Sequence, residues 1–284
     1  MEVISNKETA LEKMAEHKHH FFNHFDLSDE LKEDKELVLK HLEIDGFALE
    51  NYSSFKDDKE VVLTAVENTC FAIKYANEKY KADREVFLRA LKHSVYAFTC
   101  FDEAFEREEE MVLFSLDYHW NTLQYADKDF ADNKEIAYES VKRNSSSFQF
   151  ISDNLKNDKA FVLEMIDKFK VPFSFMSISM RDDIDVLLKV IDYERTALCF
   201  SGRKCKTNKM VVKKAIDVYG KIFYPYVKDI PNKEDFVLEL LLEKREGFSK
   251  WLSENMKDFN FSDRDLYEKV ITLTLDELDE EDVA

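Results

Sequence analysis

Apolar and polar residues recur along the chain with a period of 25 residues. DKEVVLTAV at 58–66 is followed by DREVFLRAL at 83–91, and we take Asp58 as position 1 of a unit. A fixed period in this range is typical of proteins built from stacked structural repeats. The units start at Asp34 (one residue shorter), Asp58, Asp83, Glu108, Asn133, Asp158, Asp183, Asn208 and Lys233.

The first half of each unit has the pattern of an amphipathic helix. Positions 4, 5, 6 and 9 are apolar, which places them on one helical face, whereas a half-buried strand would alternate. Position 1 is usually Asp or Asn and position 3 is often acidic, as in Asp83 and Glu85, which suits a helix N-terminus. Position 9 is always apolar: Leu42, Val66, Leu91, Leu116, Val141, Ile166, Ile191, Ile216 and Leu241.

The second half of each unit predicts one shorter helix. Further apolar residues stand at position 18 or 19 and near position 23. Pro172 fits the first turn of such a helix, whereas Pro225 falls later and predicts a kinked or shortened helix. Position 16 is also always apolar: Leu49, Ile73, Phe98, Leu123, Phe148, Phe173, Leu198, Phe223 and Phe248.

Together these patterns predict an all-α fold, an α-solenoid of about nine 25-residue helix-turn-helix repeats with atypical end caps. We expect an N-terminal cap repeat at 1–33, tandem repeats at 34–257, and a capping helix with an acidic tail at 258–284. In the N-terminal cap, Leu11, Met14 and Phe21 fill positions 6, 9 and 16. The last nine residues carry six carboxylates, so we expect that tail to be unstructured or to serve as an export signal.

Composition narrows the partners and the compartment. The formal net charge of −18 makes a grip on nucleic acid improbable, because such a grip needs Lys and Arg. No apolar run approaches a membrane span, and MEVISNKETA is unlike a secretory signal. Cys70, Cys100, Cys199 and Cys205 show no CxxC spacing, so we expect free thiols in a reducing compartment, with a Cys199–Cys205 bridge as the alternative.

A known family shares this repeat. DKEVVLTAVENTCFAIKYANEKYKADREVFLRAL from Asp58, and DGFALEN at 45–51, resemble the tandem repeat known as domain of unknown function 4116. The resemblance covers residues 34 to about 257 and is strongest over 34–100. It implies a helical-repeat protein with an interaction role, from a family that occurs in bacteria and their secreted effectors. The resemblance assigns no catalytic residues. We expect a cytoplasmic protein, or one secreted into a host cell without a signal peptide.

Histidines cluster near the N-terminus. His17, His20 and His24 have the spacing of one helical face and could bind Zn²⁺. The simpler interpretation is a solvated polar corner of the cap, because no complete ligand set accompanies them. We therefore expect no metal and no cofactor.

Positively charged residues concentrate at 203–214 in an otherwise acidic chain. They could dock a phosphate-bearing or acidic partner, or the chain's own acidic tail. The alternative is a solvated face on which Lys213, which replaces an expected leucine, extends its charge to water. The patch comprises Arg203, Lys204, Lys206, Lys209, Lys213 and Lys214.

The corner between the two predicted helices, positions 10–13, is free to vary and is rich in aromatic and basic residues. Trp, Tyr and Arg dominate protein interfaces, so these residues predict a partner-binding ridge. The alternative is that the aromatic rings pack between neighbouring corners. The proposed ridge comprises Tyr118, Trp120, Arg143, Phe169, Tyr193, Arg195 and Tyr219.

Catalytic motifs are missing from the sequence: there is no G-x-S-x-G, Walker loop or H-E-x-x-H. We therefore expect a non-catalytic scaffold that binds another protein, of unknown oligomeric state. The alternative is a regulator or small enzyme with a site at the irregular unit around 199–214, where Gly202 interrupts the second predicted helix.

Overall fold

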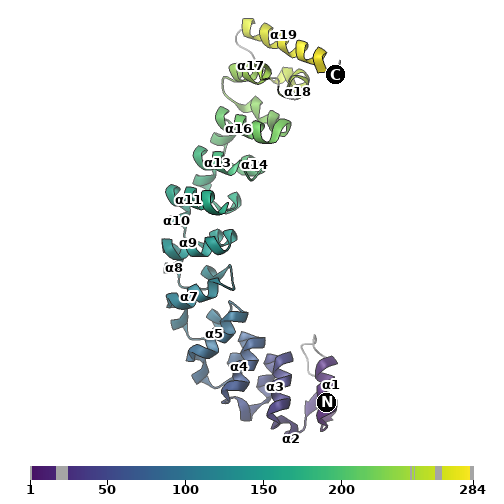
Figure 1. Cartoon of the computed structure of the whole chain (residues 1–284), viewed down its shortest axis with the longest axis vertical. Coiled ribbons are helices and arrows are strands. Elements are labelled where there is room, and N and C mark those ends of the chain that lie inside the picture. The colour runs from purple at the N-terminus through teal and green to yellow at the C-terminus, as the bar shows by residue number, and fades with distance from the viewer. Residues whose placement is uncertain (1, 17–24, 244, 246, 260–263, 282–284) are drawn as a thin grey trace. The chain divides into compact units, whose positions relative to one another are not determined.

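The computed structural model describes residues 2–16, 25–243, 245, 247–259 and 264–281. Helices form nearly all of the regular structure, which confirms the all-α repeat fold (Figure 1). Contacts divide the chain into two compact units, residues 1–150 and 151–284. The predicted domain limits at 33 and 257 stay a prediction.

The first half of each repeat in the first unit is an α-helix, as predicted. The side chains of Asp34, Asp58, Asp83 and Asn133 accept hydrogen bonds from backbone N–H groups of the first turn, whereas Glu108 makes no such cap. These helices are α3 (Lys35–Ile44), α4 (Lys59–Asn68), α5 (Arg84–His93), α7 (Glu109–Leu116) and α9 (Lys134–Arg143).

The second half of each repeat differs from the prediction of one helix. It generally holds two short helical segments, many of them 3₁₀, because position 20 begins a new one. Asn77, Asp102 and Asp127 at this position cap the second segment. The segments of the first unit are η1 (Gly46–Asn51), η2 (Ser53–Phe55), η3 (Cys70–Tyr75), η4 (Glu78–Ala82), α6 (Ala97–Cys100), η5 (Glu103–Arg107), η6 (Thr122–Gln124), α8 (Lys128–Asp132) and η7 (Ser145–Phe150).

The second unit repeats this order of elements. Ser152 and Ser177 cap α10 and α12 from position 20. The elements are α10 (Asp153–Asn157), α11 (Lys159–Phe169), η8 (Phe173–Phe175), α12 (Ile178–Arg181), α13 (Ile184–Val190), α14 (Ala197–Phe200), α15 (Arg203–Lys206), α16 (Lys209–Tyr219), η9 (Gly220–Asp229), α17 (Glu234–Leu242), α18 (Phe248–Asn255), η10 (Met256–Asp258) and α19 (Arg264–Glu281).

Two expectations for this unit were wrong. Pro225 does not shorten its helix: η9 runs through it for ten residues, because the fixed φ of proline matches that of a 3₁₀-helix. The acidic end is not unstructured up to Glu281, since it continues α19. As expected of a cap, α19 packs on α17 and α18 (Figure 1). Residues 282–284 lie outside the described residues.

The N-terminal end is an atypical repeat, with α1 (Lys7–Glu16) and α2 (Asp29–Lys32). Asn6 accepts from the backbone N–H of Thr9, and Met14 is buried, as expected of positions 1 and 9. The sequence pattern did not predict two short parallel strands, β1 (Glu2–Ile4) and β2 (Phe25–Leu27), paired Glu2↔Phe25 to Ile4↔Leu27. The predicted core residue Phe21 lies outside the described residues.

The core follows the two apolar columns. Every residue at positions 9 and 16 is buried, with at most 5% of its surface exposed. Helices α3, α4 and α5 pack in succession in the first unit, and α11, α13 and α16 do so in the second. Each repeat therefore buries its apolar side against its neighbours within a unit, as repeat proteins do.

Ion pairs connect the first helices of consecutive repeats. The cation at position 2 reaches the carboxylates at positions 1 and 3 of the next repeat, as Lys59 does with Asp83 (2.8 Å) and Glu85 (2.9 Å). Burial alone would raise the pKa of Asp83, but hydrogen bonds from Lys59 and from the Val86 N–H outweigh it, so that pKa lies below its usual value. The same clasp joins Lys7 to Asp34 and Glu36, Lys35 to Asp58 and Glu60, Arg84 to Glu108 and Glu110, and Lys159 to Asp183 and Asp185.

Candidate protein-binding surface

The short segments of the first unit carry aromatic rings at position 13, 14 or 18 of consecutive repeats, and three of these rings are exposed. Phe71, Tyr96 and Trp120 each leave 44–46% of their surface exposed, and the other members are half-buried. We call this set the aromatic row. It comprises Phe47, Phe71, Tyr96, Trp120, Tyr125 and Phe150.

Ring contacts connect the aromatic row across repeat boundaries. The Phe71 and Tyr96 ring centroids lie 6.0 Å apart, and those of Tyr96 and Tyr125 lie 5.2 Å apart, edge to face. Trp120 lies 5.4 Å from Phe150. At the N-terminal end, the Lys74 ammonium lies 5.4 Å above the Phe47 ring. The rings are thus held in place by one another while one side stays open to solvent.

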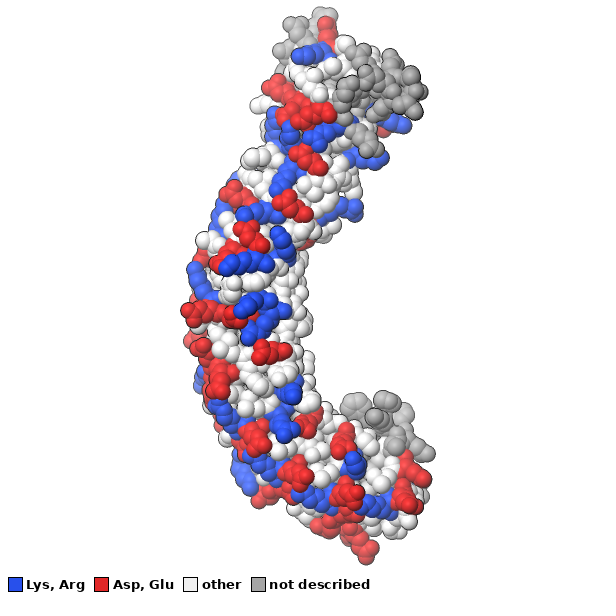
Figure 2. Space-filling model, viewed as in Figure 1, with Lys and Arg blue, Asp and Glu red and all other residues white. Residues whose placement is uncertain are grey.

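Charge is distributed unequally between the two halves of these repeats. The ranges 46–51, 70–75, 95–100, 120–125 and 145–150 contain only Glu50 and Lys74 as charged residues. By contrast, helices α3, α4, α5, α7 and α9 contain 18. In Figure 2, acidic and basic side chains cover the side on which α4, α5 and α7 lie. The aromatic row is therefore an almost uncharged strip on an otherwise highly charged unit.

Three residues of the predicted ridge lie in the first unit. Trp120 belongs to the aromatic row, and its carbonyl accepts a hydrogen bond of 2.6 Å from the Ser147 hydroxyl. Tyr118 is exposed, its ring lies tilted against that of Phe114 with centroids 5.3 Å apart, and it lines a hollow of about 630 Å³ with residues of α5. Arg143 pairs with Asp117 and Glu139 of its own unit, so its charge is neutralised locally.

The other four ridge residues lie in the second unit, where two of them have a structural role. The Tyr193 hydroxyl donates to the Val171 carbonyl (2.9 Å), and the Tyr219 hydroxyl donates to the Ile191 carbonyl (2.7 Å). These bonds tie each corner to the preceding repeat, as in the alternative of ordinary packing. Phe169 is half-buried, and Arg195 is exposed.

Comparison with known families accounts for this repeated geometry. Residues 58–106, 108–156 and 133–181 match the family described as domain of unknown function (DUF4116). The chain is similar to tandem repeats of this family over residues 58–181. The resemblance noted in the sequence is thereby confirmed over this range. Comparison with curated proteins and with solved structures gives no match.

Three of the six residues of the basic patch form ion pairs with acidic residues of neighbouring repeats. Lys213 binds Glu239 and Glu243, and Lys214 binds Asp192 (2.9 Å). Lys209 binds Glu239 (3.0 Å) and also lies over the Phe236 ring. Lys206 is half-buried on α15, where Arg203 and Lys204 are exposed. Half of the positive charges of the patch are thus neutralised by ion pairs between neighbouring repeats.

The unit around 199–214 is a regular repeat, although its sequence is irregular. Gly202 stands at position 20, where the five preceding repeats from residue 58 onward carry a capping Asn, Asp or Ser. A Cβ atom there would lie 2.3 Å from the Asp182 carboxylate. Asp182, from the preceding repeat, accepts from the Cys205 N–H (3.3 Å) and so replaces the missing cap. The glycine therefore marks the place where Asp182 takes over the capping role, and the repeat is not interrupted there.

One buried polar pair lies in the repeat that begins at Asp34. The His41 Nδ1 and the Tyr52 hydroxyl are 2.6 Å apart, and both residues are buried. Burial lowers the pKa of His41 to about 4 and raises the pKa of Tyr52. The pair is therefore part of the core.

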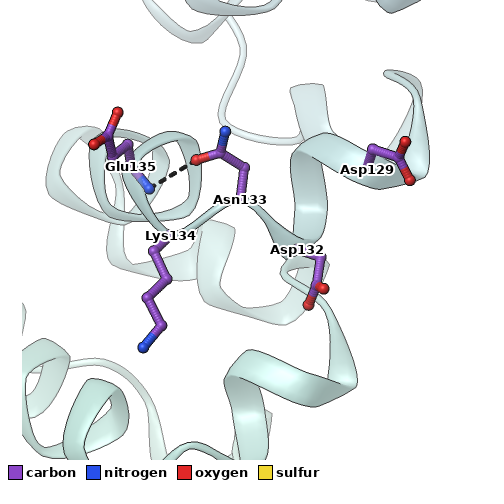
Figure 3. Close-up of a pocket in the computed structure, with 5 residues that line it drawn as sticks. All are labelled: Asp129, Asp132, Asn133, Lys134 and Glu135. Atoms are coloured by element: carbon purple, nitrogen blue, oxygen red, sulfur yellow. Dashed lines mark hydrogen bonds between the residues drawn. The ribbon is translucent and has the colours of Figure 1, made fainter.

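A metal site finds no support among the described residues. No group of three or more His, Cys, Asp or Glu side chains in the described part of the chain could hold a metal ion. His17, His20 and His24 lie outside the described residues. A hollow of about 550 Å³ beside the start of α9 is lined by Asp129, Asp132 and Glu135 among others, but these carboxylates point in different directions (Figure 3). Separately, no described helix combines the length and the apolar character needed to cross a membrane.

Proposed function

We propose that this protein is a non-catalytic helical-repeat scaffold that binds another protein through the aromatic row of its first unit. The observation that carries the proposal is a set of aromatic rings from five consecutive repeats, of which Phe71, Tyr96 and Trp120 are each about half exposed. Aromatic side chains supply large contact area at low entropic cost and dominate interface energies.

The preference for a protein partner rests on charge. Single-stranded nucleic acids also stack on aromatic side chains, but they need a basic groove for their phosphates. The aromatic row has Lys74 as its only cation, and the whole chain carries a formal net charge of −18. An extended segment with apolar or aromatic side chains matches this strip, and a phosphate backbone does not.

The charged first helices of the repeats also favour the aromatic row as the binding surface. Several of their cations and carboxylates are already paired between consecutive repeats, as in Lys59 with Asp83 and Glu85. A partner docking there would have to displace those pairs, whereas the aromatic row offers apolar surface that is still in contact with water. Burying such surface is favourable by roughly 25 cal/mol per Å².

The test begins with a displayed peptide library selected on the immobilised full chain. Selected peptides are then titrated against the Trp251→Phe protein, in which Trp120 is the only tryptophan. Trp251 is replaced because it packs among Tyr224, Phe248 and Phe259 in the second unit, so its fluorescence would report on that unit and not on the aromatic row. We expect peptides rich in apolar and aromatic residues, and a blue shift of Trp120 emission on binding.

Two variants locate the binding. Phe71→Ala combined with Tyr96→Ala should weaken binding at least about 30-fold, the effect of losing one hot spot of about 2 kcal/mol. Phe200→Ala is the control, because Phe200 is a more accessible ring of the second unit, 63% exposed. Equal binding by the double variant, or loss of binding in the control, would reject the aromatic row as the site.

A role as a secreted bacterial effector is a separate part of the proposal. It is supported only by the family resemblance and by the acidic C-terminal segment. Fusing residues 258–284 to a reporter enzyme tests it, since an export signal should carry the reporter out of a secreting host-associated bacterium. Retention of the reporter would remove this part and leave the binding proposal intact.

A further inference from the structure

Two of the four cysteines face each other across a boundary between repeats. All four are free thiols. Cys70 begins η3 and is buried, whereas Cys100 ends α6 in the next repeat and is half-buried. Their Sγ atoms lie 3.9 Å apart, and η3 packs directly against α6. A disulfide between them would bring the two sulfurs to about 2 Å.

The other two cysteines have different surroundings. Cys199 is exposed and receives a hydrogen bond from the Tyr226 hydroxyl (3.5 Å). Cys205 is fully buried beside Asp182, and burial raises its pKa to about 12. They provide an exposed and a buried internal comparison within the same chain.

The geometry assigns different roles to the two facing thiols. Cys100 is half-buried and Cys70 is buried, and the contact between their sulfurs lowers the pKa of Cys100 to about 7 and raises the pKa of Cys70. Thr99 also contacts Cys100, with its hydroxyl 3.8 Å from Sγ. Cys100 is therefore partly a thiolate near neutral pH, and the buried Cys70 thiol lies 3.9 Å from it. This is the arrangement of an attacking and a resolving cysteine.

We propose that Cys70 and Cys100 form a peroxide-sensitive dithiol site, which closes to a disulfide that links two consecutive repeats of the first unit. The inference is independent of the proposed binding function.

The proposed reaction has two steps. The Cys100 thiolate attacks one oxygen of hydrogen peroxide, the O–O bond breaks, and the departing hydroxide takes a proton to become water. Cys100 is then a sulfenic acid. Cys70 loses its proton and attacks the sulfenic sulfur, the S–O bond breaks, and a second water leaves. The two thiols lose two electrons in total, which reduce one peroxide to two waters.

The experiment treats the full chain with hydrogen peroxide and analyses it by mass spectrometry without reduction. We expect a linked peptide pair containing Cys70 and Cys100, and none when thioredoxin-type reductant is added afterwards. In the Cys70→Ser protein, Cys100 should instead accumulate as a sulfenic acid that dimedone traps. In the Cys100→Ser protein, Cys70 should stay reduced. We expect Cys100 to react about threefold faster than free cysteine at neutral pH, because its larger thiolate fraction outweighs its lower nucleophilicity.

A second variant covers the case in which substitution of buried Cys70 prevents folding. The Cys199→Ser protein changes only the exposed cysteine and keeps the facing pair, and its intact mass should fall by two hydrogen atoms on oxidation. No mass change, a mass gain from oxygen without linkage, or a linkage that includes Cys199 in the unmodified chain would each overturn the proposal.

Discussion

The two units use the same repeat for different surfaces. Positions 9 and 16 are buried and apolar throughout both units. The corner at positions 13 and 14 differs: in the first unit it carries Phe47, Phe71, Tyr96 and Trp120, and in the second it carries Lys170, Arg195 and Lys221. The frame that specifies the fold is therefore separate from the positions that give each unit its surface chemistry.

This separation has a physical cause. A substitution at position 9 or 16 opens a cavity between two repeats, which costs several kcal/mol. A substitution at the corner changes mainly what solvent meets, and such changes usually cost within about 0.5 kcal/mol. The corners can thus diversify while the frame is retained, and function is best sought there.

The largest expected effect comes from the core beneath the aromatic row. Phe87 is fully buried, stacked on Phe105 (4.2 Å) and edge to face with Phe98 and Phe101. Phe87→Ala should lower the free energy of unfolding of the first unit by about 3–5 kcal/mol. Phe71→Ala, on the exposed row, should change it by only about 0.5 kcal/mol. Urea titration measures both, and equal losses would contradict the division between frame and corner.

The next effect is a pH dependence confined to the first unit. Because the pKa of His41 lies near 4 in the folded state and about 6.5 unfolded, the unfolded chain gains a proton first as pH falls. Stability should therefore drop by up to about 3 kcal/mol between pH 6.5 and 4. Residues 151–284 contain no histidine and should lack this contribution.

Paired substitutions check the assignment to His41. His41→Gln keeps a polar partner for the Tyr52 hydroxyl and should flatten the pH profile, whereas His93→Gln on the exposed end of α5 should leave it unchanged. Hydrogen exchange followed per unit across this pH range separates the two units. A profile that persists in the His41 variant would show that other groups cause it.

A smaller effect tests the substituted cap of the second unit. Gly202→Ser introduces a Cβ into the Asp182 carboxylate and should destabilise by about 1–3 kcal/mol. Adding Asp182→Gly removes the three side-chain atoms nearest to the new Cβ and lets the introduced hydroxyl act as the cap found in other repeats, so the double variant should be more stable than the Gly202→Ser protein. Thermal melts of the three variants give the coupling. Additive losses would mean that Asp182 does not replace the cap.

The smallest effect distinguishes capping from ion pairing at the start of α5. Asp83→Ala loses both and should cost about 1 kcal/mol. Asp83→Asn keeps the cap, as Asn133 shows, and loses only the pair with Lys59, which should cost a few tenths of a kcal/mol. Because the pKa of Asp83 is lowered by folding, its contribution should vanish as pH falls below about 4. Equal costs for the two variants would assign the stability to charge.

Much of the frame could be predicted from the sequence because burial leaves a periodic trace. The columns of Leu91 and Phe98 identified the core, and Asp83 identified the helix start. The second half was interpreted as one helix because the apolar residues near positions 18 and 23 fit one face. The Asn, Asp and Ser residues at position 20 were the missed signal, since a capping residue inside a predicted helix indicates two segments.

The surface could be predicted only in part. Aromatic enrichment at the corners is visible in the sequence, and Trp120 does lie on the aromatic row. The hydroxyl bonds of Tyr193 and Tyr219 and the pairing of Arg143 depend on which atoms of the neighbouring repeat come within 3 Å. Such distances follow from the packing and leave no pattern in the sequence. Phe71 and Tyr96 lay just beyond the corner positions considered.

The most direct test of the central claim is hydrogen–deuterium exchange of the full chain with and without a selected peptide. Binding to the aromatic row predicts slower exchange at 70–75, 95–100 and 120–125, with 170–221 unchanged. Protection confined to 170–221, or to the charged first helices, would contradict the account.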